Sequence, residues 1–215
     1  MSLLFLDIET YVSKGDSSSG LNPYRKDSKV IAISYAYYQS FTIKKRDIKE
    51  LTILKEWEHK EGGEKIILKS FYDFLKSKIK SDRYTKDGKD RCGLTVIGFN
   101  HISFDLPYLF VRMCSHNLDV PGEIYKNLFS EPMHTDLMQL TQLVSKKSME
   151  YEKLMPLNQK LAAETFKLTI KEGEGKDLSN FYDDQDYGKI EKYIKEEFTF
   201  EQMYLAFIKA ILNPN

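Results

Sequence analysis

The stretch Phe5-Leu6-Asp7-Ile8-Glu9-Thr10 places two acids in an otherwise apolar segment that begins at Leu3. Such an apolar run predicts a buried strand, and the side chains of a strand alternate between the two faces of a sheet. Asp7 and Glu9 are two residues apart, so we expect both carboxylates to leave the same face. Like charges side by side near a core destabilise a fold unless a cation lies between them, which favours a metal site. The alternative is an edge strand whose acids face water.

A second apolar run, residues 94–99, predicts another buried strand, and a helix is expected from about residue 103 to 116. Ser103 is the expected cap of this helix, and Pro107 falls in its first turn, where a missing N–H does no harm. Asp105 then lies at the start of the helix, just beyond a strand end, where parallel sheets gather their ligands. The alternative is that Asp105 only complements the positive end of the helix dipole.

Apolar residues near the C-terminus follow helical spacing and predict one long helix. They are Ile190, Tyr193, Ile194, Phe198, Met203, Tyr204 and Phe207. Tyr193 and Glu197 are four residues apart and therefore share one face of this helix. The alternative is a half-buried pair without a chemical role.

Further strands are expected near residues 29–38 and 40–45, with helices near 66–80 and 136–148. A Ser/Gly-rich segment, residues 15–20, predicts a loop directly after the first strand. Strands that alternate with helices indicate an α/β sheet flanked by helices. At 215 residues we expect a single domain, residues 1–215.

Composition excludes several classes of protein. The 32 basic and 32 acidic side chains cancel, which argues against a large non-specific DNA-binding surface, because phosphate contacts dominate such affinity. No apolar run approaches the length of a membrane-spanning helix, and no basic region precedes the first apolar run, so we expect an intracellular, cytoplasmic protein without a membrane partner. Cys92 and Cys114 lack metal-ligand spacing and are expected to be free thiols. The histidines do not cluster in sequence, no zinc site is predicted, and His101 is expected at the surface.

Three ordered motifs give the chain a family resemblance. Asp-x-Glu at residues 7–9, Asn-x3-Phe-Asp at 100–105 and Tyr-x3-acid at 193–197 resemble the exonuclease motifs of the DEDD superfamily. The resemblance is greatest to the 3′–5′ exonuclease domains of family-B DNA polymerases and their stand-alone relatives. Segments 64–75 and 134–137 look like the helix after the third strand and the later strand-to-helix junction of those domains. The resemblance implies an RNase H-like fold, with a central five-stranded mixed β-sheet flanked by α-helices.

The resemblance also assigns roles to single residues. It makes four carboxylates the catalytic ligands of two divalent metal ions, namely Asp7, Glu9, Asp105 and Glu197. All-oxygen ligation favours Mg²⁺ or Mn²⁺ over zinc. Tyr193 becomes the residue that orients the attacking water. Three residues are expected to bind substrate: Thr10, Asn100 at the sugar or phosphate, and Phe104 against the terminal base, unless Phe104 is only a core residue.

The function expected from this resemblance is metal-dependent 3′–5′ exonuclease activity on single-stranded DNA ends, releasing nucleoside monophosphates. One alternative keeps the chemistry and changes the substrate to RNA, because no motif reads a 2′-hydroxyl. Another is a catalytically silent nucleic-acid-binding module. Glu197 raises that alternative, because the family pattern ends in aspartate and glutamate shifts the carboxylate by up to about 1.5 Å. The acids at positions 7, 9 and 105 argue against it, because a dead site need not tolerate clustered charges.

Overall fold

The computed structural model describes residues 2–13, 22–39, 51–83, 93–144, 158–168 and 177–212. These residues form a five-stranded sheet with the order β3-β2-β1-β4-β5. The strands are β1 (Ser2–Tyr11), β2 (Lys29–Tyr38), β3 (Thr52–Lys55), β4 (Leu94–Gly98) and β5 (Met133–Asp136). Strand β1 runs antiparallel to β2 and parallel to β4, so the sheet is mixed. This is the RNase H-like α/β fold that the motif resemblance implied.

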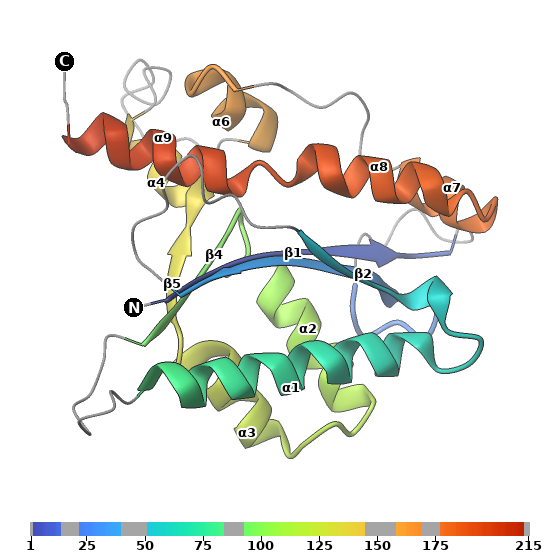
Figure 1. Cartoon of the computed structure of the whole chain (residues 1–215). Coiled ribbons are helices and arrows are strands. Elements are labelled where there is room, and N and C mark those ends of the chain that lie inside the picture. The colour runs from blue at the N-terminus through green and yellow to red at the C-terminus, as the bar shows by residue number, and fades with distance from the viewer. Residues whose placement is uncertain are drawn as a thin grey trace.

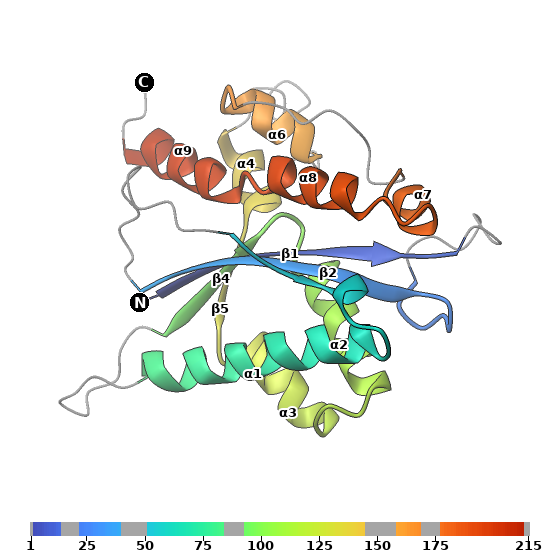
Figure 2. The same ribbon diagram turned by 45° about the vertical axis from the view of Figure 1, so that its right-hand side comes forward.

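Helices cover both faces of the sheet (Figures 1 and 2). One face, called here the lower face, carries α1 (Gly63–Arg83), α2 (Asp105–Ser115) and α3 (Pro121–Tyr125). A 3-10 turn (Glu56–Glu58) precedes α1, and a π-helical turn (Lys126–Ser130) follows α3. The opposite, upper face carries α4 (Leu137–Val144), α6 (Gln159–Thr165), α7 (Leu178–Asp183), α8 (Tyr187–Glu197) and α9 (Phe200–Leu212).

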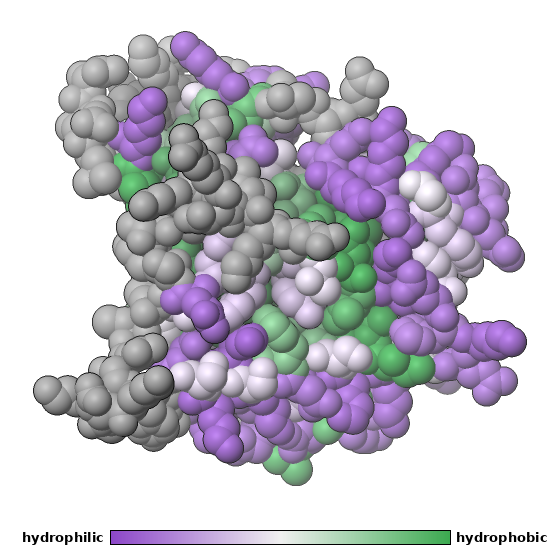
Figure 3. All heavy atoms as spheres, viewed as in Figure 1, coloured by the Kyte–Doolittle hydropathy of each residue, from purple (hydrophilic) through white to green (hydrophobic). Residues whose placement is uncertain are grey.

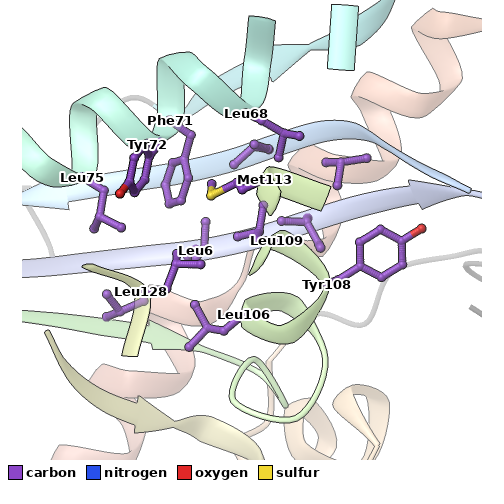
Figure 4. Close-up of a cluster of buried hydrophobic side chains, with 14 of the residues drawn as sticks. Leu6, Leu68, Phe71, Tyr72, Leu75, Leu106, Tyr108, Leu109, Met113 and Leu128 are labelled. Carbon is purple, nitrogen blue, oxygen red and sulfur yellow. The ribbon is translucent and has the colours of Figure 1, made fainter. Parts of the chain in front are cut away.

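The core of the lower face is continuous along β1 (Figure 4). Leu4, Leu6 and Ile8 alternate with the residues of the other face and pack with α1 and α2 in one cluster. Helix α1 contributes a stripe at helical spacing, from Ile67 through Phe71 to Leu75. Strand β1 is therefore held from below along most of its length.

The upper core is divided. Among the described residues, a first upper cluster joins Leu3 and Phe5 to α4, α6 and α9, and a second upper cluster joins Ile31 and Ala32 to α7 and α8. Asp7 and Glu9 fall between Phe5 and Tyr11 on this face. In Figure 3, hydrophilic side chains lie on the outer surfaces and apolar ones are visible between the layers. Asp7 and Glu9 are exceptions to this pattern.

A β-bulge lies at the end of the regular pairing between β1 and β2. Glu9 pairs with Ala32 and Thr10 with Val30, so that Ile31 is an extra residue on β2. As a result, both Ile31 and Ala32 contribute to the second upper cluster.

Most expected elements are confirmed. Strand β2 has the predicted bounds, β4 ends one residue before the predicted end, and α1 extends the expected helix by three residues at each end. The predicted junction at 134–137 is present, because β5 ends at Asp136 and α4 begins at Leu137. The predicted strand at 40–45 and the predicted loop at 15–20 lie outside the described residues, and no strand was predicted at residues 52–55, where β3 lies.

Two predictions at helix ends are wrong. Helix α2 begins at Asp105 after Phe104, without a side-chain cap, and Ser103 is exposed. The expected long C-terminal helix is two helices, since α8 ends at Glu197 and α9 begins at Phe200. Thr199 and Gln202 match the capping-box spacing, which explains a new helix start at this point.

Within the described ranges no helix is both long enough and apolar enough to cross a membrane.

Candidate functional site

The Asp-x-Glu motif lies on the upper face of β1. Pairing with β2 is regular from Leu3 to Glu9, so Asp7 and Glu9 follow Leu3 and Phe5 onto that face. Their cross-strand partners are Ser34 and Ala32, which are short side chains. Glu9 is 7% exposed and Asp7 is half-buried. The two acids thus share one face, as the sequence predicted, beneath the layer that contains α8.

Asp105, the first residue of α2, contacts the same strand β1 beyond the point where β1 pairs with β4. Strand β4 pairs with β1 only from Ser2 to Phe5, so its pairing has ended before Ile8. There the Asp105 carboxylate Oδ1 accepts a hydrogen bond from the Ile8 backbone N–H at 3.1 Å. Asp105 is 3% exposed. The first and second motifs therefore meet at one place, with Asp105 anchored to the residue between Asp7 and Glu9.

The turn that leads into α2 is tightly held. Asn100 has a φ of 59°, a left-handed conformation that asparagine tolerates well. Its carbonyl accepts the N–H groups of Ser103 and Phe104 at 3.1 and 3.0 Å. The Asp136 carboxylate accepts the N–H groups of Asn100 at 2.9 Å and Ile102 at 3.3 Å. Asp136 had no predicted role, although an acid that ends a strand and precedes a helix is a recognisable cap signal.

His101 lies inside this turn, and its predicted surface position is wrong. The side chain is fully buried, with its ring centroid 5.6 Å from that of His134 and its Nδ1 3.6 Å from Asp136 Oδ2. Burial, with a smaller effect of the neighbouring His134, lowers the pKa of His101 to about 3. The left-handed residue before it turns the chain back, so that His101 packs onto Gly98. A methyl group at Gly98 would lie 2.8 Å from the His101 Cβ.

The third motif is on α8. Tyr193 is 8% exposed and belongs to the second upper cluster together with Ala32, the cross-strand partner of Glu9. Tyr193 therefore lies over the sheet face that carries the Asp-x-Glu acids. Glu197 is the last residue of α8, and its side chain lies outside the described residues. Its assignment as a metal ligand stays a prediction.

The three predicted substrate-binding residues are placed differently from one another. Thr10 is 9% exposed and follows the bulge. Asn100 is half-buried at the turn. Phe104 packs against the lower core, with its ring centroid 5.7 Å from that of Tyr108, which is the core position that the sequence analysis left open. In the same turn, Ile102 is 36% exposed and is the more accessible apolar side chain.

The donor chemistry of this site fits a hard divalent cation. Asp7, Glu9 and Asp105 offer carboxylate oxygens, which Mg²⁺ and Mn²⁺ prefer. Within the part of the chain that the structure describes, no group of three or more His, Cys, Asp or Glu side chains is placed to hold a metal ion. Mg²⁺ commonly takes one or two protein carboxylates and completes its shell with water and substrate phosphate. The described side chains therefore form no closed metal cage by themselves, and the two-ion site stays a prediction.

Glu64, a buried acid at the start of α1, is neutralised by Arg112. Arg112 donates to both of its carboxylate oxygens, at 2.7 and 2.6 Å, and His116 Nε2 lies 2.7 Å away. The Val30 backbone N–H donates at 2.8 Å. Burial alone would raise the pKa of Glu64, but these hydrogen bonds more than offset it and hold the pKa below its ordinary value. Glu64 is therefore a structural acid.

No protein-family model and no curated protein sequence matches this chain. Among solved structures, the chain is similar to the family B DNA polymerase from the hyperthermophilic archaeon Pyrobaculum calidifontis, with a TM-score of 0.59 and 15% sequence identity. The match covers 99% of this chain and 24% of the polymerase chain, so this chain spans about a quarter of that protein's length. At this identity the likeness shows the fold.

Proposed function

We propose that this protein is a metal-dependent 3′–5′ exonuclease that hydrolyses single-stranded DNA ends to nucleoside monophosphates. The observation that carries the proposal is the hydrogen bond from Ile8 N–H to Asp105, which joins two motifs 97 residues apart in sequence. The fold is shared with a family B DNA polymerase, and the motifs resemble the exonuclease domains of that class. The 3′–5′ polarity comes from the motif resemblance.

Phosphodiester hydrolysis needs an activated water on one side of phosphorus and a stabilised alkoxide leaving group on the other. Two divalent ions about 3.5–4 Å apart supply both effects when bound. Asp7, Glu9 and Asp105 would hold these ions, with Glu197 as the fourth carboxylate. Tyr193 orients the water, because a tyrosine with an ordinary pKa near 10 is a poor base at neutral pH.

The backbone position of Glu197 supports its inclusion. Ile194 belongs to the second upper cluster and Phe198 packs against the first, so α8 ends at the boundary between the two clusters. Asp7 and Glu9 occupy the same boundary on β1, between Phe5 and Tyr11. This common position at the boundary between the two clusters of described residues supports Glu197 as the fourth carboxylate.

The activity is tested with a 5′-labelled single-stranded DNA oligonucleotide in Mg²⁺, in Mn²⁺ and in chelator. We expect a ladder that shortens from the 3′ end with either metal and disappears with chelator and in Asp105→Ala. Asp119→Ala is the matched control, because Asp119 is an acid bound to Tyr72 and Lys76 on the lower side, away from the motifs. Absence of cleavage by wild-type protein under both metals contradicts the proposal. The same assay with an RNA strand decides between the two nucleic acids.

Glu197 has its own test. Glu197→Ala is expected to reduce kcat at least about 100-fold, because a misplacement of only about 1 Å already costs that much. Glu197→Asp restores the shorter side chain of the family pattern and is expected to raise turnover in Mg²⁺ relative to Mn²⁺, because Mg²⁺ demands the stricter geometry. Unchanged activity in Glu197→Ala means that another residue is the fourth ligand.

The second candidate is a catalytically silent nucleic-acid-binding module. It is favoured by the finding that no three described acid, histidine or cysteine side chains are placed to hold a metal ion. This candidate predicts that the wild-type protein binds the labelled strand equally well with and without metal and leaves it intact.

A further inference from the structure

We propose that Asp136 is a positioning residue that sets the place of Asp105 by holding the turn from Asn100 to Phe104. The proposal rests on the proposed function in so far as Asp105 is a metal carboxylate. Asp136 is the last residue of β5 and is 4% exposed. Its carboxylate accepts three backbone N–H groups, from Asn100 at 2.9 Å, Ile102 at 3.3 Å and Met138 at 3.0 Å.

These contacts connect Asp136 to Asp105 in short steps. Asp136 fixes both ends of the segment Asn100–Ile102. The carbonyl of Asn100 then accepts the N–H of Phe104 at 3.0 Å, and the carbonyl of His101 accepts that of Leu106 at 2.9 Å. Phe104 and Leu106 flank Asp105, so the orientation of the first turn of α2 follows from the turn that Asp136 holds.

The buried ring of His101 supports the turn from inside. It lies between Gly98, His134 and Asp136, so the turn is packed against the end of β4. Gly98 itself approaches the Leu6 carbonyl so closely that a methyl group there would lie 2.8 Å from the oxygen. The end of β4, the turn and the start of α2 therefore form one packed unit against β1.

A carboxylate suits this task better than an amide. Oδ1 serves Asn100 and Met138, while Oδ2 serves Ile102. Asparagine carries a single acceptor oxygen, so Asp136→Asn can keep the two bonds of Oδ1 but presents an NH₂ group to the Ile102 N–H. This variant loosens the turn and retains the cap of α4.

The opposing interpretation is that Asp136 is only the cap of α4. Asn158→Ala is the matched control, because the Asn158 side chain caps α6 by accepting the Leu161 N–H at 2.8 Å and lies outside the motifs. A pure capping role predicts that Asp136→Asn, which keeps the Met138 bond, is about as stable as the wild type, whereas Asn158→Ala loses its cap and is less stable. It also predicts an unchanged contact between Asp105 and Ile8 in both variants.

The test is amide hydrogen exchange at Ile8, measured by NMR without metal or substrate. In Asp136→Asn we expect Ile8 to exchange at least about tenfold faster, while the amides of β2 that pair with β1 keep their wild-type rates, because only the local bond opens. In Asn158→Ala we expect no change at Ile8. An unchanged Ile8 rate in Asp136→Asn overturns the proposal, and so does a variant that lacks any cooperative thermal transition, because the carboxylate then serves the whole fold.

Activity gives the second readout. Asp136→Asn is expected to lower kcat about tenfold or more with KM for the oligonucleotide changed less than twofold, because a misplaced carboxylate affects the chemical step. A change in KM alone contradicts a positioning role. If wild-type protein shows no nuclease activity, the proposed function fails, while the Ile8 exchange result still decides whether Asp136 positions Asp105.

Discussion

The two faces of strand β1 are packed in different ways. On the lower face, Leu4, Leu6 and Ile8 form part of a continuous core. On the upper face, Leu3 and Phe5 are followed by Asp7 and Glu9, and the core among the described residues divides there into separate clusters. Burying a large aliphatic side chain contributes about 1.5–3 kcal/mol, so two acids at core positions forgo substantial stability. The comparison teaches that the lower face is packed for stability, whereas the upper face forgoes stability at the two acids that we propose as metal ligands.

The strongest test makes the upper face resemble the lower one. The double variant Asp7→Leu/Glu9→Leu is expected to lower kcat/KM at least about 10³-fold, a loss of about 4 kcal/mol of transition-state stabilisation. Its free energy of unfolding is expected to rise by about 1–2 kcal/mol, because two apolar side chains join the divided core. The measurements are the oligonucleotide assay and urea unfolding.

Ile8→Asp is the mirror-image control for that variant. It places an acid on the lower face, where we expect the free energy of unfolding to fall by about 3 kcal/mol or more. A double variant that is less stable than the wild type breaks the comparison between the faces.

The next test concerns Glu64, the buried acid of the lower layer whose charge Arg112 neutralises. Arg112→Met leaves Glu64 buried without its guanidinium, and we expect the free energy of unfolding to fall by about 3 kcal/mol. The double variant Glu64→Gln/Arg112→Met is expected to recover most of this loss, because no unpaired charge remains. Urea unfolding measures both. A change in kcat/KM of more than twofold, assayed well below the unfolding transition, would mean that Glu64 is not purely structural.

The pH dependence of stability tests the burial of His101. Its folded-state pKa of about 3 lies below the ordinary value of 6.5, so the unfolded chain takes up a proton first as the pH falls. This contribution to stability is full above about pH 6.5 and is lost toward pH 3, at about 1.4 kcal/mol per pH unit. Between pH 7 and pH 5 we expect His101 to account for about 2 kcal/mol of lost stability, measured by urea unfolding.

The variant His101→Met removes this titration and should flatten the pH dependence by that amount, whatever its effect at pH 7. His59→Gln is the control, because His59 is exposed. Equal pH slopes in wild type and His101→Met would show that His101 does not stay neutral in the folded protein.

The smallest expected effect concerns close packing at the end of β4. A methyl group at Gly98 would lie 2.8 Å from both the Leu6 carbonyl oxygen and the His101 Cβ, so Gly98→Ala is expected to lower the free energy of unfolding by about 1.5 kcal/mol. Gly122→Ala, in α3, has nothing within 4 Å of the added methyl group and is expected to be neutral or slightly stabilising. Thermal unfolding of the two variants gives the measurement, and equal transition temperatures would contradict the close approach.

Much of the architecture could be predicted from local patterns. Strands β2 and β4 are mostly apolar runs, and their predicted bounds are confirmed at all but one position. The separation of α8 from α9 was missed because apolar spacing continues through Phe198, and the capping residues at 199 and 202 were not weighed against it. A short helix break depends on local hydrogen bonds that hydrophobic periodicity does not report.

The site could be predicted in part. Period-two alternation placed Asp7 and Glu9 on one face, and the family resemblance named Asp105. The burial of His101 could not be predicted, because it depends on the left-handed turn at Asn100 and on the neighbouring strand β5. The role of Asp136 depends likewise on backbone groups that are 34 and 36 residues away in sequence. Such contacts are set by tertiary structure and leave only a weak trace in a single sequence.

The bulge at Glu9 and Thr10 has a consequence for folding fidelity. A one-residue slip of β1 against β2 would turn Asp7 and Glu9 into the lower core and carry Leu6 and Ile8 to the opposite side. The extra residue Ile31 favours a single alignment of β1 with β2, because any shifted alignment would move the bulge away from Glu9 and Thr10. The bulge thus favours the one alignment of β1 against β2 that keeps Asp7 and Glu9 on the upper face.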